Sequence, residues 1–164
     1  MQVKEIVAKV QNSAVFKQWY QEHDSAYLAH VFFMEAEDGK SSYDVGYYLK
    51  SEDRMASFGL DKDVEFRGFS EVFKKPEATI DELDLSKVDT TTEDALETAK
   101  KLQEEEYPKS KPVKRIVILQ HLTQGQVWNI TYVAENFKTL NIKIDAATGK
   151  IVEHKLLDLI QKAL

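Results

Sequence analysis

Apolar residues near the start of the chain follow the period of a helix, and those after residue 25 follow the period of a strand. Residues 3–10 and 13–22 are predicted to form two helices, the second capped by Asn12 or Ser13. Three stretches alternate at period two and are predicted strands: residues 26–34, 43–50 and 55–61. The first of these strands is apolar on both sides, which indicates a central position in a sheet.

The second half of the chain repeats this order. A helix is predicted after a capping box formed by Thr90 and Glu93 or by Thr91 and Asp94, and it ends near Tyr107. Its apolar stripe is predicted to be buried: Ala95, Leu96, Ala99 and Leu102. Three more strands are predicted to follow: residues 113–122, 126–135 and 137–145.

The C-terminal residues return to helical spacing. The apolar positions that carry this pattern are Val152, Leu156, Leu159, Ile160 and Ala163. A final helix is therefore predicted, which would cover an open sheet face or dock on a second copy of the chain.

Equivalent positions in the two halves match in register. The offset is nearly constant over three pairs: 85 residues from Tyr43 to Trp128 and from Tyr47 to Tyr132, and 84 from Asp61 to Asp145. Internal duplication explains this regularity most simply. The predicted fold is an α+β protein with two tandem units, residues 1–70 and 91–164, joined by a connector, residues 71–90. Each unit is expected to be a three-stranded antiparallel sheet packed by a helix, and the final helix is added to the second.

Three segments of the second half, "TTTEDALETAKKL", "VWNITYV" and "IKIDAATGKIVE", resemble the PepSY domain family. In that family a helix packs on a three-stranded antiparallel sheet whose last strand ends in an Asp-x-x-Thr-Gly turn. The resemblance covers residues 91–154. It extends to residues 13–61 only through the repeat, because "GLDKDVEF" keeps the aspartate and lacks Thr-Gly. It implies two PepSY-like or cystatin-like units, the first of them divergent.

The turn at residues 145–149 has a local physical explanation. The Asp145 carboxylate can cap the turn, the Thr148 hydroxyl can add a local hydrogen bond, and Gly149 can adopt a left-handed conformation. We therefore expect a structural role for these three residues, with ligand contact as the alternative.

Four aromatic residues form the most suggestive candidate site: Tyr43, Tyr47, Trp128 and Tyr132. They are predicted to share a strand face, where rings either pack beneath a helix or line a groove for a peptide or a small apolar ligand. His121 is added as a candidate binding residue. Four apolar residues are predicted on the opposite face, which then needs a cover: Val117, Leu119, Val127 and Val133.

Composition excludes several kinds of function. A net charge of -6 with scattered Lys and Arg disfavours nucleic acid as a partner. The lack of cysteine removes thiolate chemistry and sulfur-ligated zinc, and the histidines show no metal-ligand spacing, so no metal and no cofactor are predicted. No apolar run reaches the length of a membrane span. The sequence as written indicates a cytoplasmic protein, or an extracytoplasmic one if a signal peptide was removed.

Together these features predict a non-enzymatic module that binds a protein or peptide. The PepSY resemblance implies regulation of a protease or of an envelope protein, because PepSY domains occur in propeptides of thermolysin-type metalloproteases and in envelope proteins. Two alternatives remain open, a carrier of a small apolar ligand in a helix–sheet cavity and an enzyme on a cystatin-like fold. A third alternative is a homodimer formed through the final helix or a sheet face.

Overall fold

Three helices and one short 3-10 helix lie before and between the strands in the computed structural model, which describes residues 2–35, 41–72, 74–75 and 77–158. The helices are α1 (Val3–Asn12), α2 (Ala14–Glu22) and α3 (Thr92–Glu106), and the 3-10 helix is Leu85–Lys87. The Ser13 hydroxyl accepts a hydrogen bond from the Phe16 amide and caps α2. The Thr91 hydroxyl accepts one from the Asp94 amide and caps α3.

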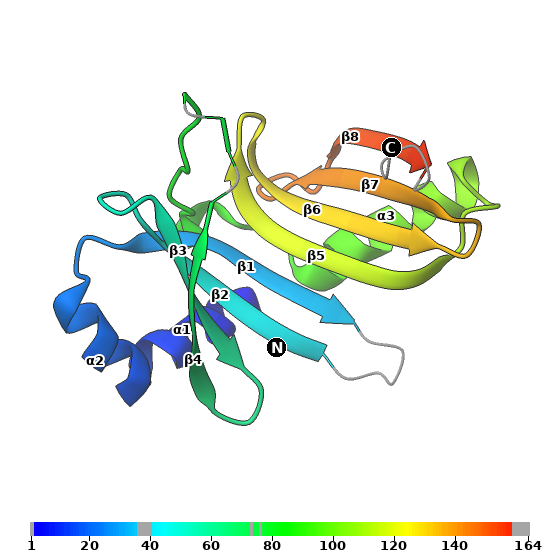
Figure 1. Ribbon diagram of the computed structural model, residues 1–164. Coiled ribbons are helices and arrows are strands. Elements are labelled where there is room, and N and C mark those ends of the chain that lie inside the picture. Colours follow the sequence, from blue (N-terminus) through cyan, green and yellow to red (C-terminus); the bar gives the residue numbers. More distant parts are fainter. Residues whose placement is uncertain (1, 36–40, 73, 76, 159–164) are drawn as a thin grey trace.

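All the described strands belong to one antiparallel sheet with the order β4-β3-β2-β1-β5-β6-β7-β8 (Figure 1). The first four are β1 (Tyr27–Glu35), β2 (Ser41–Leu49), β3 (Arg54–Leu60) and β4 (Val64–Glu71). The second four are β5 (Pro112–Leu122), β6 (Gly125–Ala134), β7 (Lys138–Asp145) and β8 (Ile151–Asp158). The two first strands, β1 and β5, pair at the centre of the sheet.

The prediction of two tandem three-stranded units is therefore wrong. A single eight-stranded sheet runs through both halves, because β1 and β5 join them by backbone hydrogen bonds rather than by packing of two separate sheets. Each half also contributes a fourth strand. The strand order is symmetric about the β1–β5 ladder, and Tyr43 pairs with Leu60 as Trp128 pairs with Ile144.

The predicted C-terminal helix is also wrong over the part that the structure describes. Residues 151–158 form β8, which pairs with β7 from Lys138↔Asp158 to Ile144↔Ile151. The free edge of β7 supplies backbone partners to this segment, and such pairing overrides a weak helical pattern. Residues 159–164, which carried the rest of that prediction, lie outside the described residues.

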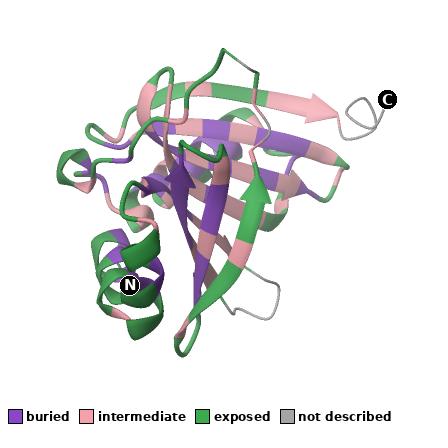
Figure 2. Ribbon diagram, turned by 60° about the vertical axis from the view of Figure 1, so that its left-hand side comes forward, coloured by how far each residue is buried: buried purple, intermediate pink, exposed green. Residues whose placement is uncertain are grey.

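The main core lies between the sheet and the helices. It joins the buried faces of α1, α2 and α3 to side chains of most strands. Val117 and Leu119 belong to this core, because they pair with Ile130 and Trp128 and point to the same side. Their predicted place on the opposite face is therefore wrong. Figure 2 shows the resulting gradient, with the inner strands mostly buried and the edge strand β4 mostly exposed.

A second, smaller cluster lies on the other side of the sheet. Ala29, Tyr48 and Met55 form it, and Ile80 from the long connector between β4 and α3 packs against them. The connector thus covers one end of the helix-free face. No helix in the described part of the chain is long and apolar enough to cross a membrane.

Candidate functional site

The helix-free side of the sheet, which we call the open face, carries partly exposed apolar side chains on its central strands. Figure 1 views this side, with α1 and α3 behind the strands. Two rows of directly opposed residues cross it: Asp44, Phe32, Ile118, Asn129, Lys143 and Glu153, and next to them Ser42, Met34, Ile116, Thr131, Asn141 and Lys155. Each row spans six strands from β2 to β8, a width of roughly 24 Å at the usual strand spacing.

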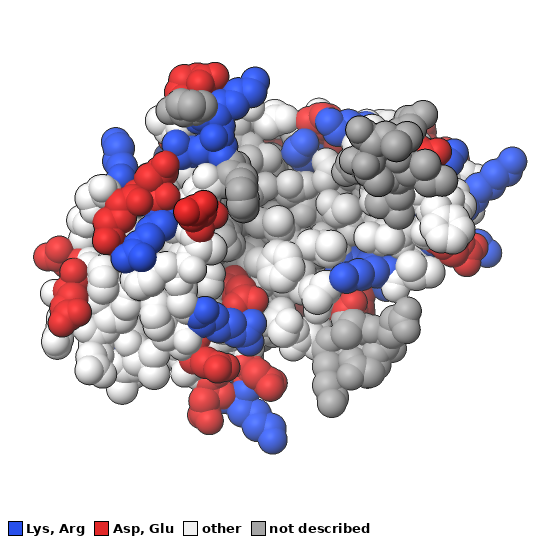
Figure 3. Space-filling model, viewed as in Figure 1, with Lys and Arg blue, Asp and Glu red and all other residues white. Residues whose placement is uncertain are grey.

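The centre of the open face is apolar. Four half-buried side chains meet on the paired strands β1 and β5: Phe32, Met34, Ile116 and Ile118. In Figure 3 most Lys, Arg, Asp and Glu side chains lie toward the edges of this view, and much of its middle is uncharged. An apolar centre with a charged rim is the usual composition of a protein interface.

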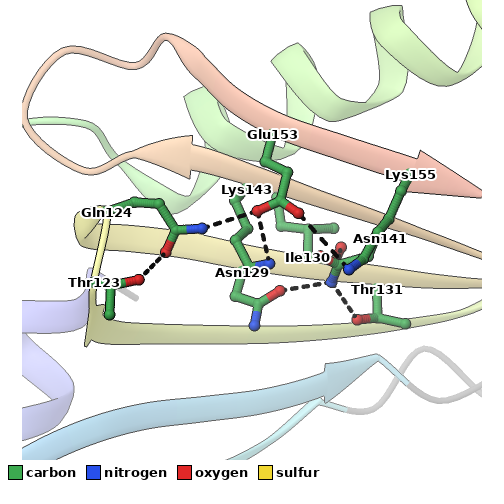
Figure 4. Close-up of polar contacts among 9 residues, drawn as sticks. All are labelled: Thr123, Gln124, Asn129, Ile130, Thr131, Asn141, Lys143, Glu153 and Lys155. Atoms are coloured by element: carbon green, nitrogen blue, oxygen red, sulfur yellow. Dashed lines mark hydrogen bonds and ion pairs between the residues drawn. The ribbon is translucent and has the colours of Figure 1, made fainter.

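Beside this apolar centre lies an ordered polar group on β6 and β7 (Figure 4). The Asn141 Nδ2 atom donates to Asn129 Oδ1 at 2.7 Å and to Thr131 Oγ1 at 3.1 Å. All three side chains are half-buried, so they remain accessible at the surface. Their hydrogen bonds to one another hold these polar groups in fixed positions, which lowers the entropic cost of binding a partner.

An ion pair between β7 and β8 lies at the edge of the open face, next to this polar group. The Lys143 Nζ atom lies 3.2 Å from Glu153 Oε2, and Gln124 Nε2 donates to the same oxygen at 2.8 Å. The hydrogen bond and charge of Lys143 hold the pKa of Glu153 below its usual value. Glu153 is therefore ionised at neutral pH.

At one end of the open face the connector forms a strap, residues 77–82. The Tyr27 hydroxyl donates to the Ile80 carbonyl, and His121 Nδ1 lies 2.9 Å from the Glu82 carbonyl oxygen. Because a carbonyl oxygen can only accept, Nδ1 of His121 carries the proton. Just beyond the strap, the Leu83 amide donates to the Leu28 carbonyl at 2.8 Å.

The strap separates two hollows. The larger, which we call the strap cleft, has a volume of about 580 Å³ and lies between the strap and the β5–β6 hairpin. The smaller, about 370 Å³, lies on the other side of the strap next to Tyr27, Tyr48 and Asp53. The cleft continues the open face, because its floor and far wall include His30, Gln120 and Lys143 from the same side of the sheet.

Three of the four aromatic candidates are buried on the helix side of the sheet, away from the open face. Tyr47, Trp128 and Tyr132 are 3%, 1% and 2% exposed, and Tyr43 is half-buried against the same core. The Trp128 Nε1 atom donates to the Thr90 carbonyl at 3.1 Å. Burial raises the pKa of Tyr47 to about 12, so its phenol stays neutral and accepts a hydrogen bond from Gln11. These rings pack between sheet and helices.

The other candidates divide between the cleft and the turn. His121 lines the strap cleft while it tethers the strap. At the turn, Asp145 Oδ1 accepts from the amides of Ala147 and Thr148 at 2.9 and 2.8 Å, and Thr148 Oγ1 accepts from the Lys150 amide at 3.3 Å. Gly149 has a φ of 73°.

Sequence reasoning missed most of the open face. The alternation of Phe32 and Met34 with Val31 was visible, but it could not show which side the helices cover. The polar group could have been predicted from the sequence. Asn129, Thr131 and Asn141 alternate with large apolar residues along two predicted strands, which places the three polar side chains on the face opposite the core. The described residues include no group of three or more His, Asp or Glu side chains placed to hold a metal ion.

Comparison with known proteins shows a likeness in structure. No protein-family model matches the chain, and no curated protein matches it. The fold is similar to the crystal structure of a "putative lipoprotein" from Clostridium difficile 630, with a TM-score of 0.58 and 17% identity over 90% of this chain and 93% of that one. At this identity the likeness shows a shared fold and no more, and the PepSY resemblance stays a prediction.

Proposed function

We propose that this protein is a non-catalytic module that binds a protein or an extended peptide on its open face. The observation that carries the proposal is the pair of cross-strand rows that place Phe32, Met34, Ile116 and Ile118 beside the ordered Asn129, Thr131 and Asn141. A sheet face of this kind is normally covered, since large contiguous apolar surfaces on a monomer mark interaction sites.

The shape of the surface favours a macromolecular partner over a small ligand. Small molecules bind in concave sites that bury most of their surface, whereas the rows extend over six strands. Apolar residues at the centre would supply the binding energy, and the amide and hydroxyl groups beside them would set the register of the partner. The alternative of an apolar ligand between helix and sheet loses support because Trp128 and Tyr132 fill that layer.

The test begins with selection of peptides from a displayed random library against the full chain. The selected peptides are then measured by fluorescence anisotropy on the native protein and on Ile118→Lys. We expect the charge at the centre of the face to weaken binding about tenfold or more, because a lysine there must lose its hydration when the partner docks. The matched control is Val15→Gln, since Val15 is 39% exposed on α2, behind the sheet.

Two results would count against the proposal. The first is a selection that enriches no peptide, and the second is a set of peptides whose affinity changes with Val15→Gln but not with Ile118→Lys. Sedimentation of the same proteins separates self-association from partner binding. A dimer that Ile118→Lys converts to a monomer would show that the open face binds a second copy of this chain instead.

The location of this module is part of the proposal. We infer that it acts outside the cytoplasm, because the structurally similar protein from Clostridium difficile 630 is described as a "putative lipoprotein". Immunodetection of the natural protein in fractionated cells tests this inference, and recovery in the cytosolic fraction alone would contradict it.

A further inference from the structure

The floor of the strap cleft includes the imidazole ring of His30, which lies flat over a glycine. His30 on β1 lies across Gly46 on β2, and an ideal Cβ on Gly46 would stand 2.2 Å from Cε1 of the imidazole. No side chain at position 46 could share that space with the ring. On its other side His30 pairs with Gln120 of β5, so an imidazole and a carboxamide from neighbouring strands both line the cleft.

The His30 ring and the Gln120 carboxamide can each both donate and accept hydrogen bonds. Burial lowers the pKa of His30, so its ring is neutral at pH 7, with one nitrogen as donor and the other as acceptor. The Gln120 carboxamide likewise has both donors and an acceptor. Thr79 and Thr123 donate their hydroxyl protons to Asp81 and Gln124, so their oxygens add neutral acceptors around the cleft, and Gln124 keeps a second N–H as a donor.

Charge around the cleft disfavours an anionic ligand. Lys143 is the cation among the lining residues, and its ammonium already lies 3.2 Å from Glu153. The strap contributes two exposed carboxylates to the lining, Glu77 and Asp81. A carboxylate in the cleft would therefore meet like charges and no unpaired cation from the lining, whereas an amide would find partners for both its N–H and C=O groups.

We propose that the strap cleft binds a carboxamide side chain, that of Gln or Asn, from the segment docked on the open face. The inference rests on the proposed function, because the cleft lies at the end of that face. Its volume of about 580 Å³ has room for such a side chain together with part of the backbone that carries it. A site that satisfies an amide rejects groups that cannot pair with it, so the cleft would select sequence while the apolar centre supplies affinity.

The test uses four blocked amino acids as probes: the N-acetyl amides of glutamine, glutamate, lysine and leucine. Each is titrated into the ¹⁵N-labelled full chain and followed by NMR. We expect the glutamine probe to shift the amide signals of Gln120, Thr123 and Gln124, and to bind at least about threefold more tightly than the other three.

Two glycine variants localise the effect. Gly46→Ala forces the His30 ring off its place, and binding of the glutamine probe should fall about fivefold or more. Gly59→Ala is the matched control, because its Cβ would displace Arg67 on the same face, away from the cleft lining. This variant should bind within about twofold of the native protein. If Gly46→Ala fails to fold, Gln120→Met removes the carboxamide at similar volume and carries the same expectation.

Preference for the glutamate, lysine or leucine probe would overturn the inference, as would unchanged binding in both Gly46→Ala and Gln120→Met. A glutamine probe that leaves the signals of the cleft residues unmoved would also overturn it. The proposed function has its own readout: library peptides that depend on Ile118 but are indifferent to Gly46→Ala would leave the open face as a binding surface and remove the cleft from it.

Discussion

The guanidinium of Arg67 on β4 reaches across Gly59 on β3 to Asp44 on β2, where it makes hydrogen bonds of 3.0 and 2.9 Å to the two carboxylate oxygens. An ideal Cβ on Gly59 would lie 2.0 Å from Nε of Arg67, so this path exists because residue 59 has no side chain. Both bonds come from one nitrogen, Nη1, and this ion pair ties the edge strand to the interior of the sheet.

Gly59→Ala should therefore lower the free energy of unfolding by about 1 kcal/mol, chiefly by breaking the Arg67–Asp44 pair. Urea denaturation measures the change. The same substitution in an Arg67→Ala background should cost much less, because the pair is already absent. An equal loss in both backgrounds would show that the cost has another origin.

The turn before β8 depends on one carboxylate. Asp145→Ala leaves the amides of Ala147 and Thr148 without their acceptor, and should destabilise the protein by about 1–2 kcal/mol. Asp145→Asn keeps one carbonyl acceptor and should lose less than half as much. Thermal or urea unfolding distinguishes them, and equal losses would mean that the charge rather than the capping matters.

His30 should make stability depend on pH below neutrality. Its folded pKa is lowered by burial, so between that value and the unfolded value of about 6.5 the unfolded chain binds more protons. The contribution is fully present above about pH 6.5 and is lost as the pH falls through the folded pKa. NMR titration of the His30 ring should give a pKa below 6.5, and His30→Gln should flatten the stability profile in this window. A ring that titrates at or above 6.5 would contradict the burial argument.

A side-chain hydrogen bond links the edge strand β8 to Tyr107, the residue at the C-terminal end of α3. The Tyr107 hydroxyl lies 2.6 Å from Nδ1 of His154. Tyr107→Phe removes this bond and should speed amide hydrogen exchange in β8, with little change in β5 and β6 at the centre of the sheet. Exchange read by mass spectrometry provides the measurement. Uniform acceleration across the sheet would indicate global destabilisation instead of local release.

The helices could be predicted because their signals are local. The stripe of α1 and the cap of α3 at Thr91 depend on residues within a few positions of one another. The joining of both halves into one sheet could not be predicted in the same way. It depends on the pairing of β1 with β5, whose residues lie about 80–90 positions apart, and antiparallel pairing between distant strands has no local sequence mark.

The two misread segments have separate causes. β4 was not predicted as a strand, because a bulge near Gly68, which has a φ of 98°, breaks the alternation and puts Phe66 and Phe69 opposite Phe58 and Ala56. In β8 the helical spacing depended on Val152, Leu156 and residues past 158, while Glu153, Lys155 and Leu157 also alternate as a strand. The two periods coincide over so short a stretch, and the free edge of β7 decides between them.

The open face was hidden for a related reason. Val31 and Phe32 are both apolar, and only the positions of α1 and α3 determine which of them meets solvent. Alternation assigns residues to two faces without saying which face is covered. The aromatic residues drew attention because of their size, yet size is also what places Trp128 and Tyr132 in the core.

The central claim is that the open face is the binding surface, and methyl NMR with a spin-labelled library peptide tests it most directly. The methyl groups of Met34, Ile116 and Ile118 report on the open face, and those of Ile6, Ile130 and Ile142 report on the helix side. The account predicts that the bound peptide broadens the first set most strongly and leaves the second set sharp. Stronger broadening of Ile6 or Ile130, with Met34 and Ile118 unaffected, would contradict it.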